Sequence, residues 1–157
     1  MLIPSFSSQN RLTINEFSFL QIKDAELCAD EGAAHVNGAL SDEVLFTRGL
    51  IAKAKSSYLE AKSFFQSCLA LSPKHAKALQ QLAHVHYLLG NLQTAEKFFK
   101  DSLDVDSDSH ETWHFLSLVY IETKQHDKAS DCTRKSTDLE KNSPVISISA
   151  ISRLTLE

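Results

Sequence analysis

Two histidines four residues apart are the first candidates for chemistry in this sequence. His110 and His114 would lie on one face of a helix, and this spacing can hold Zn²⁺. His84 and His86 precede them in the chain, but His86 is expected to pack among aromatic residues. Since no acidic or thiol side chain completes a ligand set, we predict no metal site.

An alternating run of aspartates resembles the beginning of a calcium-binding loop. Asp104, Asp106 and Asp108 have the spacing of its first three ligands. However, Ser109 stands at the sixth position, which requires glycine, and Phe115 stands at the twelfth position, which requires glutamate. We therefore predict a solvated turn at this place and no calcium site.

A cysteine with a histidine and an aspartate nearby has the residue types of a thiol nucleophile. These residues are Cys132, His126 and Asp127. Neither an oxyanion-stabilising feature nor a glycine-rich loop accompanies them, and a position on an exposed helix surface explains them better. The sequence contains no other catalytic motif. We predict that the protein is not an enzyme and needs no cofactor.

The composition limits the classes of partner. The 157 residues carry a formal net charge of −4 without a basic stripe, which argues against binding to nucleic acid. No run of 18 apolar residues occurs, so we expect no direct insertion into a membrane. The first residues lack the basic start and apolar core of a signal peptide. With three cysteines, an odd number, and no glycosylation acceptor, we expect a reduced, cytosolic protein.

Three stretches of the chain align at a spacing of 34 residues. Each unit has a large apolar residue, a small residue four positions later, an alanine in its second half and a further position for an aromatic ring. The residues in these four positions are Leu45, Leu79 and Trp113; Gly49, Ala83 and Ser117; Ala61, Ala95 and Ala129; and Phe65, Phe99 and Thr133. This is the pattern of the tetratricopeptide repeat, in which each unit is a pair of antiparallel helices.

The period predicts an all-α solenoid of antiparallel helix pairs, wound as a right-handed superhelix. Its complete repeats are expected at residues 42–75, 76–109 and 110–143. Asp108 and Glu111 are expected to cap the helix that carries Trp113. Only 4 glycines and 3 prolines occur, which suits helices joined by short turns.

The ends of the chain fit the period less well. Residues 25–41 are expected to form the second helix of a partial repeat and a turn, after an irregular or degenerate start at residues 1–24. Because Phe6, Phe17 and Phe19 make this start apolar, we expect a carboxy-terminal fragment or short isoform of a longer array, with a tendency to associate. The tail at residues 144–157 contains six aliphatic residues. It either lies extended on the last helix pair or is a floppy terminus.

The first helix of each unit should line the concave face of the solenoid, so the residues of this face follow from the phase. Aromatic and aliphatic side chains with polar neighbours are expected where a helix or an extended peptide docks. The alternative for Leu50, Phe115 and Leu118 is packing between repeats. The predicted partner-binding residues are Phe46, Leu50, Gln80, His84, Tyr87, His114, Phe115 and Leu118.

The predicted groove lacks the residues that grip a carboxyl terminus. Co-chaperone repeats that do so use Lys, Asn and Arg side chains to pair with carboxylates. Only Lys77 is suitable here, so we predict no such clamp. The equivalent positions carry Phe46, Leu50, Gln81, Glu111 and Phe115.

Several runs of the sequence resemble the carboxy-terminal end of the tetratricopeptide repeat protein 7 family, over about residues 25–157. They include residues 45–51 (LFTRGLI), 72–80 (SPKHAKALQ) and 110–113 (HETW). Near the end come residues 143–145 (SPV) and 151–154 (ISRL), where that family also terminates.

This resemblance implies a non-catalytic scaffold. Members of the family hold a phosphatidylinositol 4-kinase at the cytosolic face of the plasma membrane. They bridge the kinase to a lipid-anchored membrane adaptor and to a helical partner of the hyccin family, which their carboxy-terminal repeats help to receive. Two alternatives stay open. One is an adaptor of another cytosolic assembly, such as intraflagellar transport, a ubiquitin ligase or a peroxisomal receptor, and the other is a regulatory fragment of a larger enzyme.

Overall fold

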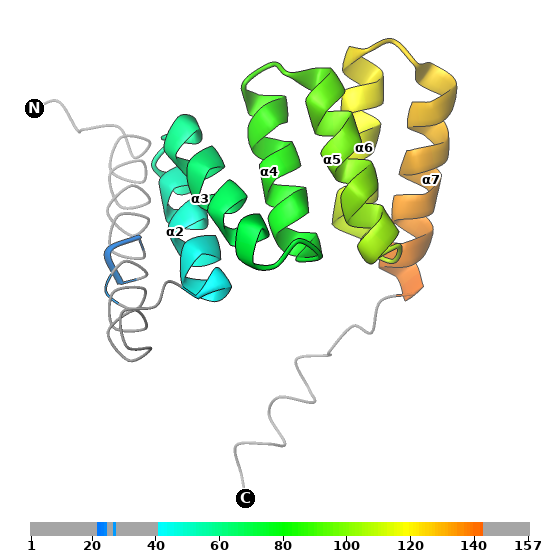
Figure 1. Cartoon of the computed structure of the whole chain (residues 1–157). Coiled ribbons are helices and arrows are strands. Elements are labelled where there is room, and N and C mark those ends of the chain that lie inside the picture. Colours follow the sequence, from blue (N-terminus) through cyan, green and yellow to red (C-terminus); the bar gives the residue numbers. More distant parts are fainter. Residues whose placement is uncertain (1–21, 25–26, 28–40, 143–157) are drawn as a thin grey trace, which may run out of the picture.

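The computed structural model describes residues 22–24, 27 and 41–142. Between residues 41 and 142 the chain forms six α-helices in three antiparallel pairs (Figure 1). Residues 22–24 and 27 are helical, and no strand occurs among the described residues. The predicted all-α tetratricopeptide solenoid is confirmed. The helices are α2 (Asp42–Ala54), α3 (Tyr58–Leu71), α4 (Ala76–Leu88), α5 (Leu92–Val105), α6 (His110–Glu122) and α7 (His126–Asn142).

Most of what we predicted for the two ends of the chain lies outside the described residues. This holds for the start apart from residues 22–24, for the partial repeat before residue 41 apart from residue 27, and for the tail.

The first helix of each pair begins at a cap in the same position of the repeat. Ser41 and Ser109 accept hydrogen bonds with their hydroxyl oxygens from the amides of Val44 and Thr112, at 3.2 and 3.4 Å. In the middle pair the ring nitrogen Nδ1 of His75 takes this role. Side-chain acceptors at this position satisfy amides that have no partner within the helix. Our expectation that Asp108 caps α6 was wrong, because Ser109 is the capping residue.

The turn inside each pair contains one residue in the left-handed backbone conformation. This residue is Ser56 after α2, Gly90 after α4 and Lys124 after α6, with φ angles of 62°, 77° and 60°. Only glycine adopts this conformation without a steric cost. The 34-residue register therefore extends to the backbone of the turns.

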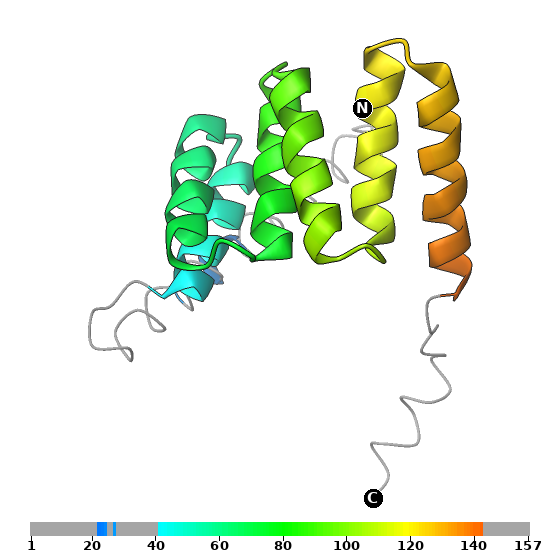
Figure 2. The same cartoon turned by 45° about the vertical axis from the view of Figure 1, so that its right-hand side comes forward.

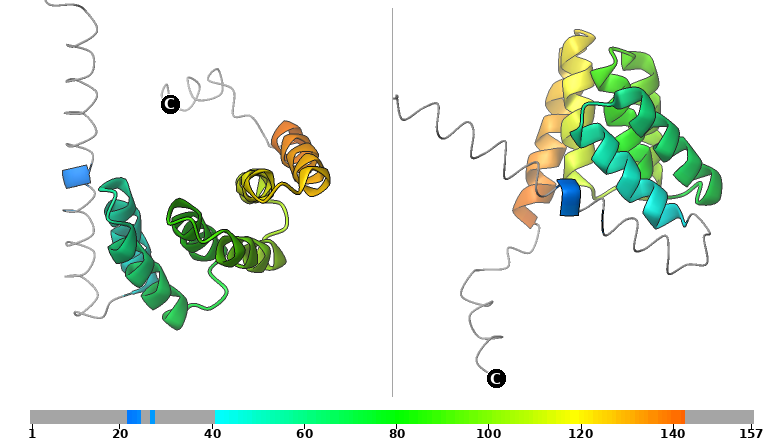
Figure 3. Two further views of the ribbon diagram at one scale, coloured as in Figure 1. Left: turned by 90° about the horizontal axis from the view of Figure 1, so that it is seen from above. Right: turned by 90° about the vertical axis from the view of Figure 1, so that its left-hand side faces the viewer.

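The order of contacts gives the solenoid its inner and outer sides. Each helix packs against the next one in sequence, and α2 also approaches α4 as α4 approaches α6. The outer helices α3, α5 and α7 make no close backbone approach to one another within the described part of the chain. The first helices of the pairs, α2, α4 and α6, therefore lie closer to one another and form the inner side of the solenoid. Figure 2 shows the pairs standing side by side, and Figure 3 shows their axes changing direction along the array.

Small residues at the helix crossings leave room for large ones from the neighbouring helix. A Cβ added at Gly49 would lie 2.5 Å from the Phe65 ring. Phe65 and its equivalent Phe99 are fully buried and fill the gaps between successive pairs. In the last pair the equivalent residue is Thr133, which is exposed and bonds to the Ala129 carbonyl oxygen.

Candidate protein-binding site

The inner helices α2, α4 and α6 contribute to a cavity of about 480 Å³. It collects three of the predicted partner-binding residues, which are His84, His114 and Phe115. The cavity is open to solvent and lies where the predicted concave face passes from α2 to α7. Its complete lining is Lys53, Gln81, His84, His110, Glu111, His114, Phe115, Ser136 and Glu140.

One wall of the cavity is aromatic. The ring of Phe115 stacks on His84, with the ring centroids 4.4 Å apart, and on Phe99, at 6.0 Å. His114 tilts against Phe115 at 5.8 Å and is itself exposed. Stacked rings of this kind form a rigid surface whose outer edge can receive an apolar side chain. Phe115 also packs against the core, so it belongs both to the fold and to this wall.

A polar network between α2 and α4 adjoins this wall at His84. The Lys53 ammonium group donates a hydrogen bond to the Gln81 side-chain oxygen. Its Nζ also lies 3.2 Å from Nδ1 of His84. Because an ammonium group can only donate, Nδ1 accepts, and the ring proton of His84 is on Nε2. The imidazole is therefore neutral in this arrangement.

The electrostatics of the network agree with a neutral histidine. Burial, together with the positive charge of Lys53, lowers the pKa of His84 to about 4. Burial also lowers the pKa of Lys53, while the nearby carboxylate of Glu111 acts in the opposite direction. Lys53 is thus the cationic group of the site, and Glu111 and Glu140 supply negative charge at its edge.

Gln80 is placed differently from our prediction. It is only 4% exposed and donates a hydrogen bond from Nε2 to the Glu111 carboxylate, at 3.2 Å. This bond links α4 to α6. Gln80 lines a separate cavity of about 190 Å³ between the two helix pairs. We infer that Gln80 orients Glu111 and is not itself available to a partner.

Four further predicted residues lie outside the large cavity. Phe46 packs against Phe65 and His75, with ring centroids 5.9 and 5.0 Å apart, and Leu50 packs against the same core. The ring of Tyr87 is tilted against that of His84, with the ring centroids 6.4 Å apart. Leu118 is half-buried. For Phe46, Leu50 and Phe115 the structure therefore gives a packing role whether or not a partner binds.

Four residues of the cavity were not predicted to belong to the inner face, namely Lys53, His110, Ser136 and Glu140. Lys53 stands 34 residues before Tyr87, so the period already pointed to it. Ser136 and Glu140 come from the outer helix α7, which we had not expected to contribute to the inner face. Ser136 is held against α6, because its hydroxyl donates a hydrogen bond to the His110 carbonyl oxygen at 2.8 Å.

Two aliphatic side chains are exposed at the ends of the inner helices. Leu88 ends α4 and is 41% exposed, and Ile121 lies in the last turn of α6 and is 50% exposed. Both positions belong to the inner face by their phase in the repeat. Neither lines the cavity, but exposed aliphatic residues on the same side of the solenoid are suitable anchors for an apolar partner segment.

The other candidates for chemistry have structural explanations. Asp106 accepts a hydrogen bond from the amide of Asp108 at 3.2 Å in the turn between α5 and α6. Cys132, expected on an exposed surface, is only 7% exposed because it packs against the core of the last two pairs, and burial raises the pKa of its thiol. Within the described ranges, no three His, Cys, Asp or Glu residues are grouped so that they could hold a metal ion. None of the described helices is long and apolar enough to cross a membrane.

Comparison with known families agrees with the helix pairs. Two models of the tetratricopeptide repeat match the chain, one at residues 52–114 and one at residues 110–143. The chain therefore belongs to the tetratricopeptide repeat family.

Within that family the chain is similar to tetratricopeptide repeat protein 7B of Homo sapiens, with 34% identity over 131 residues. It is also 31% identical over 132 residues to tetratricopeptide repeat protein 7A of the same species. These matches cover 83% and 84% of this chain but only 15% of each relative. The predicted resemblance to the tetratricopeptide repeat protein 7 family is thereby confirmed. A second relative is BBSome complex member BBS4 of Bos taurus, 29% identical over 76% of this chain and 24% of that protein.

Solved structures share the fold at low sequence identity. The Sgt2 repeat domain from Aspergillus fumigatus superposes with a TM-score of 0.62 at 20% identity, over 71% of this chain and 72% of that one. The first repeat domain of Spaghetti, bound to an HSP90 peptide, superposes with a TM-score of 0.63 at 15% identity, over 73% and 87% of the two chains. These likenesses describe the architecture alone.

Proposed function

We propose that this protein is a non-catalytic scaffold whose inner face, from α2 to α7, binds a segment of a protein partner. The observation that carries the proposal is the open cavity of about 480 Å³, which has an aromatic wall and a polar network that meets this wall at His84. Protein-binding surfaces commonly combine an apolar centre with a polar surround. Leu88 and Ile121 add exposed aliphatic side chains at the ends of the inner helices α4 and α6.

The similarity to tetratricopeptide repeat proteins 7A and 7B supports a particular assembly. On this basis the partner is a hyccin-like protein, and the assembly contains a phosphatidylinositol 4-kinase. The scaffold would lie at the cytosolic face of the plasma membrane, held there by its partners and by a lipid-anchored adaptor. Since the chain spans 15% of these relatives, it carries only part of the surfaces that the whole assembly uses.

The proposal is tested by binding of a purified hyccin-like protein to two double variants. In the first, Leu88→Asp and Ile121→Asp place charge on the inner face. In the second, Leu59→Asp and Leu71→Asp place the same charge on the outer helix α3, where these residues are 74% and 57% exposed. Loss of binding in the first variant and retention in the second support the proposal. Equal binding by both folded variants contradicts it.

A second candidate function is an adaptor of another assembly, and the similarity to BBSome complex member BBS4 favours it. The two candidates share the groove and differ in the partner. Binding of the unmutated chain to a BBSome subunit, without binding to a hyccin-like protein, would select the adaptor.

A further inference from the structure

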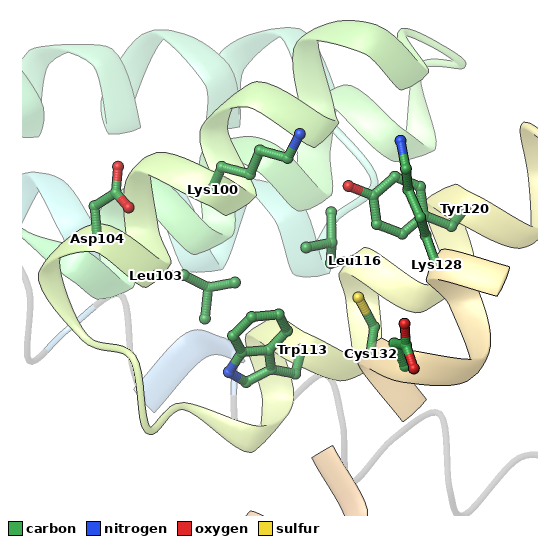
Figure 4. Close-up of a pocket in the computed structure, with 9 residues that line it drawn as sticks. Lys100, Leu103, Asp104, Trp113, Leu116, Tyr120, Lys128 and Cys132 are labelled. Carbon is green, nitrogen blue, oxygen red and sulfur yellow. The ribbon is translucent and has the colours of Figure 1, made fainter. Parts of the chain in front are cut away.

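A second cavity lies on the outer side of the last two helix pairs. It has a volume of about 290 Å³ and lies between α5 and α7, with α6 as its floor. Such a gap is possible because α5 and α7 do not approach each other closely. Figure 4 shows Trp113, Leu116 and Tyr120 in this cavity, with Cys132 beside them. None of these residues lines the inner cavity described above.

The 34-residue register shows what this cavity lacks. Cys132 is equivalent to Phe98 on α5, and Tyr120 is equivalent to His86 on α4. The preceding interval is the gap between α3 and α5, with α4 as its floor. There Phe98 stacks on His86, with ring centroids 5.6 Å apart, and packs against two core clusters. The corresponding place beside Tyr120 contains only a thiol. The outer cavity therefore lies at the place that corresponds to Phe98, where the last repeat has no aromatic ring. The Lys128 ammonium group lies 5.5 Å from the centroid of the Tyr120 ring, at the edge of this cavity.

Several polar groups around the cavity already have partners within the chain. The indole nitrogen Nε1 of Trp113 donates to the Ser107 carbonyl oxygen at 2.8 Å. The Tyr120 hydroxyl donates to Glu96 at 3.1 Å, and Glu96 also pairs with Lys100 at 2.7 Å. A ligand that fills this space is thus not required to satisfy buried polar atoms, and its apolar surface decides its affinity.

We propose that the outer cavity binds an aromatic side chain of a protein partner, which takes the place that Phe98 occupies in the preceding interval. The expected ligand is a phenylalanine-sized ring that lies against Tyr120 and Leu116. This site is separate from the inner groove, so it does not depend on the function proposed for the groove.

Cys132 allows a direct test, because its thiol lies in the cavity. Thiol–disulfide exchange with a disulfide probe forms the mixed disulfide of Cys132 and releases the second half of the probe as a free thiol. One probe would carry 2-phenylethanethiol and the other propanethiol, each paired with cysteamine. The adducts would be equilibrated with 2-mercaptoethanol and counted by mass spectrometry in a Cys28→Ser background, since Cys68 is fully buried. A Ser63→Cys variant provides an exposed thiol on α3 as the matched control.

Burial of the ring should make the phenylethyl adduct at Cys132 about tenfold more resistant to release than the propyl adduct. At the exposed thiol of the control variant the two adducts should be equally resistant. Equal resistance at Cys132 would overturn the proposal, as would a preference of the same size at the control position.

A variant that needs no probe gives an independent readout. Cys132→Phe supplies the missing ring from within the chain, as Phe98 does in the preceding interval. The melting temperature should rise by a few degrees, and a lower value would show that the cavity cannot accept a ring. Phe98→Cys provides the converse variant, and it should lower the melting temperature by emptying the filled site.

Discussion

The ammonium nitrogen of Lys53 lies 3.2 Å from Nδ1 of His84, and this contact joins α2 to α4 across 31 positions of the sequence. The contact requires a neutral imidazole, because a protonated ring would face the lysine with a second positive charge. The inner face therefore contains a group whose protonation opposes the folded arrangement.

The first prediction concerns acid sensitivity. The pKa of His84 is about 4 in the folded chain and 6.5 for an ordinary histidine, so the unfolded chain binds more protons between these values. The contribution of His84 to the free energy of unfolding should therefore be constant above about pH 6.5 and fall as the pH drops toward 4. With allowance for partial exposure, the loss should be on the order of 1–2 kcal/mol, measured by urea unfolding at several pH values.

His84→Leu is the matched variant for this prediction. The equivalent residues in the other two repeats are Leu50 and Leu118, so a leucine suits the position. The part of the acid sensitivity that His84 causes should disappear. An unchanged pH profile between 6.5 and 4 would show that other groups produce it, His86 being the first to examine because burial also lowers its pKa.

The second prediction concerns the left-handed turns. Lys124 has a φ angle of 60°, at the position where Gly90 stands in the preceding repeat. Lys124→Gly should remove this strain and stabilise the fold by up to about 1 kcal/mol. Gly90→Ala should destabilise it by a similar amount through backbone strain alone, since a Cβ there would meet no atom within 4 Å. Thermal melts should show a higher melting temperature for Lys124→Gly and a lower one for Gly90→Ala.

The third prediction concerns the crossing of α2 and α3. Because a Cβ at Gly49 would lie 2.5 Å from the Phe65 ring, Gly49→Ala should cost about 1–3 kcal/mol. Gly49→Ala should cause a smaller loss of stability in a Phe65→Leu background, where the ring is absent. A double-mutant cycle measures this coupling, and simple additivity would show that the two residues do not interfere.

The fourth prediction tests the phase of the repeat in the core. Leu82 is almost completely buried between α4 and its neighbours, so Leu82→Ala should cost about 2–5 kcal/mol. Leu59→Ala removes the same atoms from an exposed position on α3 and should change the stability by less than about 0.5 kcal/mol. Similar losses in the two variants, measured by denaturant unfolding, would contradict the assigned phase.

The sequence predicted the fold well because the period is carried by residues with one physical role each. Gly49, Ala83 and Ser117 are small where helices cross, and Phe65 and Phe99 are large where pairs meet. A fixed spacing of such residues identifies the helices and their order without any knowledge of the contacts.

The site was harder to predict, because period and phase say which side a residue faces but not how deeply it lies. Gln80 has the phase of the inner face yet is buried against Glu111, and Phe46 turns into the core. Glu140 lies in the cavity although it belongs to an outer helix. Such placements depend on how adjacent pairs rotate against each other, which the spacing of small and large residues does not specify.

The central claim is that the inner face binds the partner. Its most direct test is the dissociation constant of a hyccin-like protein for the unmutated chain, for Leu88→Asp with Ile121→Asp, and for Leu59→Asp with Leu71→Asp. Because Leu88 and Ile121 are the proposed apolar anchors, the inner-face variant should bind at least about tenfold more weakly, whereas the outer variant should bind like the unmutated chain. If the outer variant loses affinity and the inner-face variant keeps it, the partner binds elsewhere and the claim is contradicted.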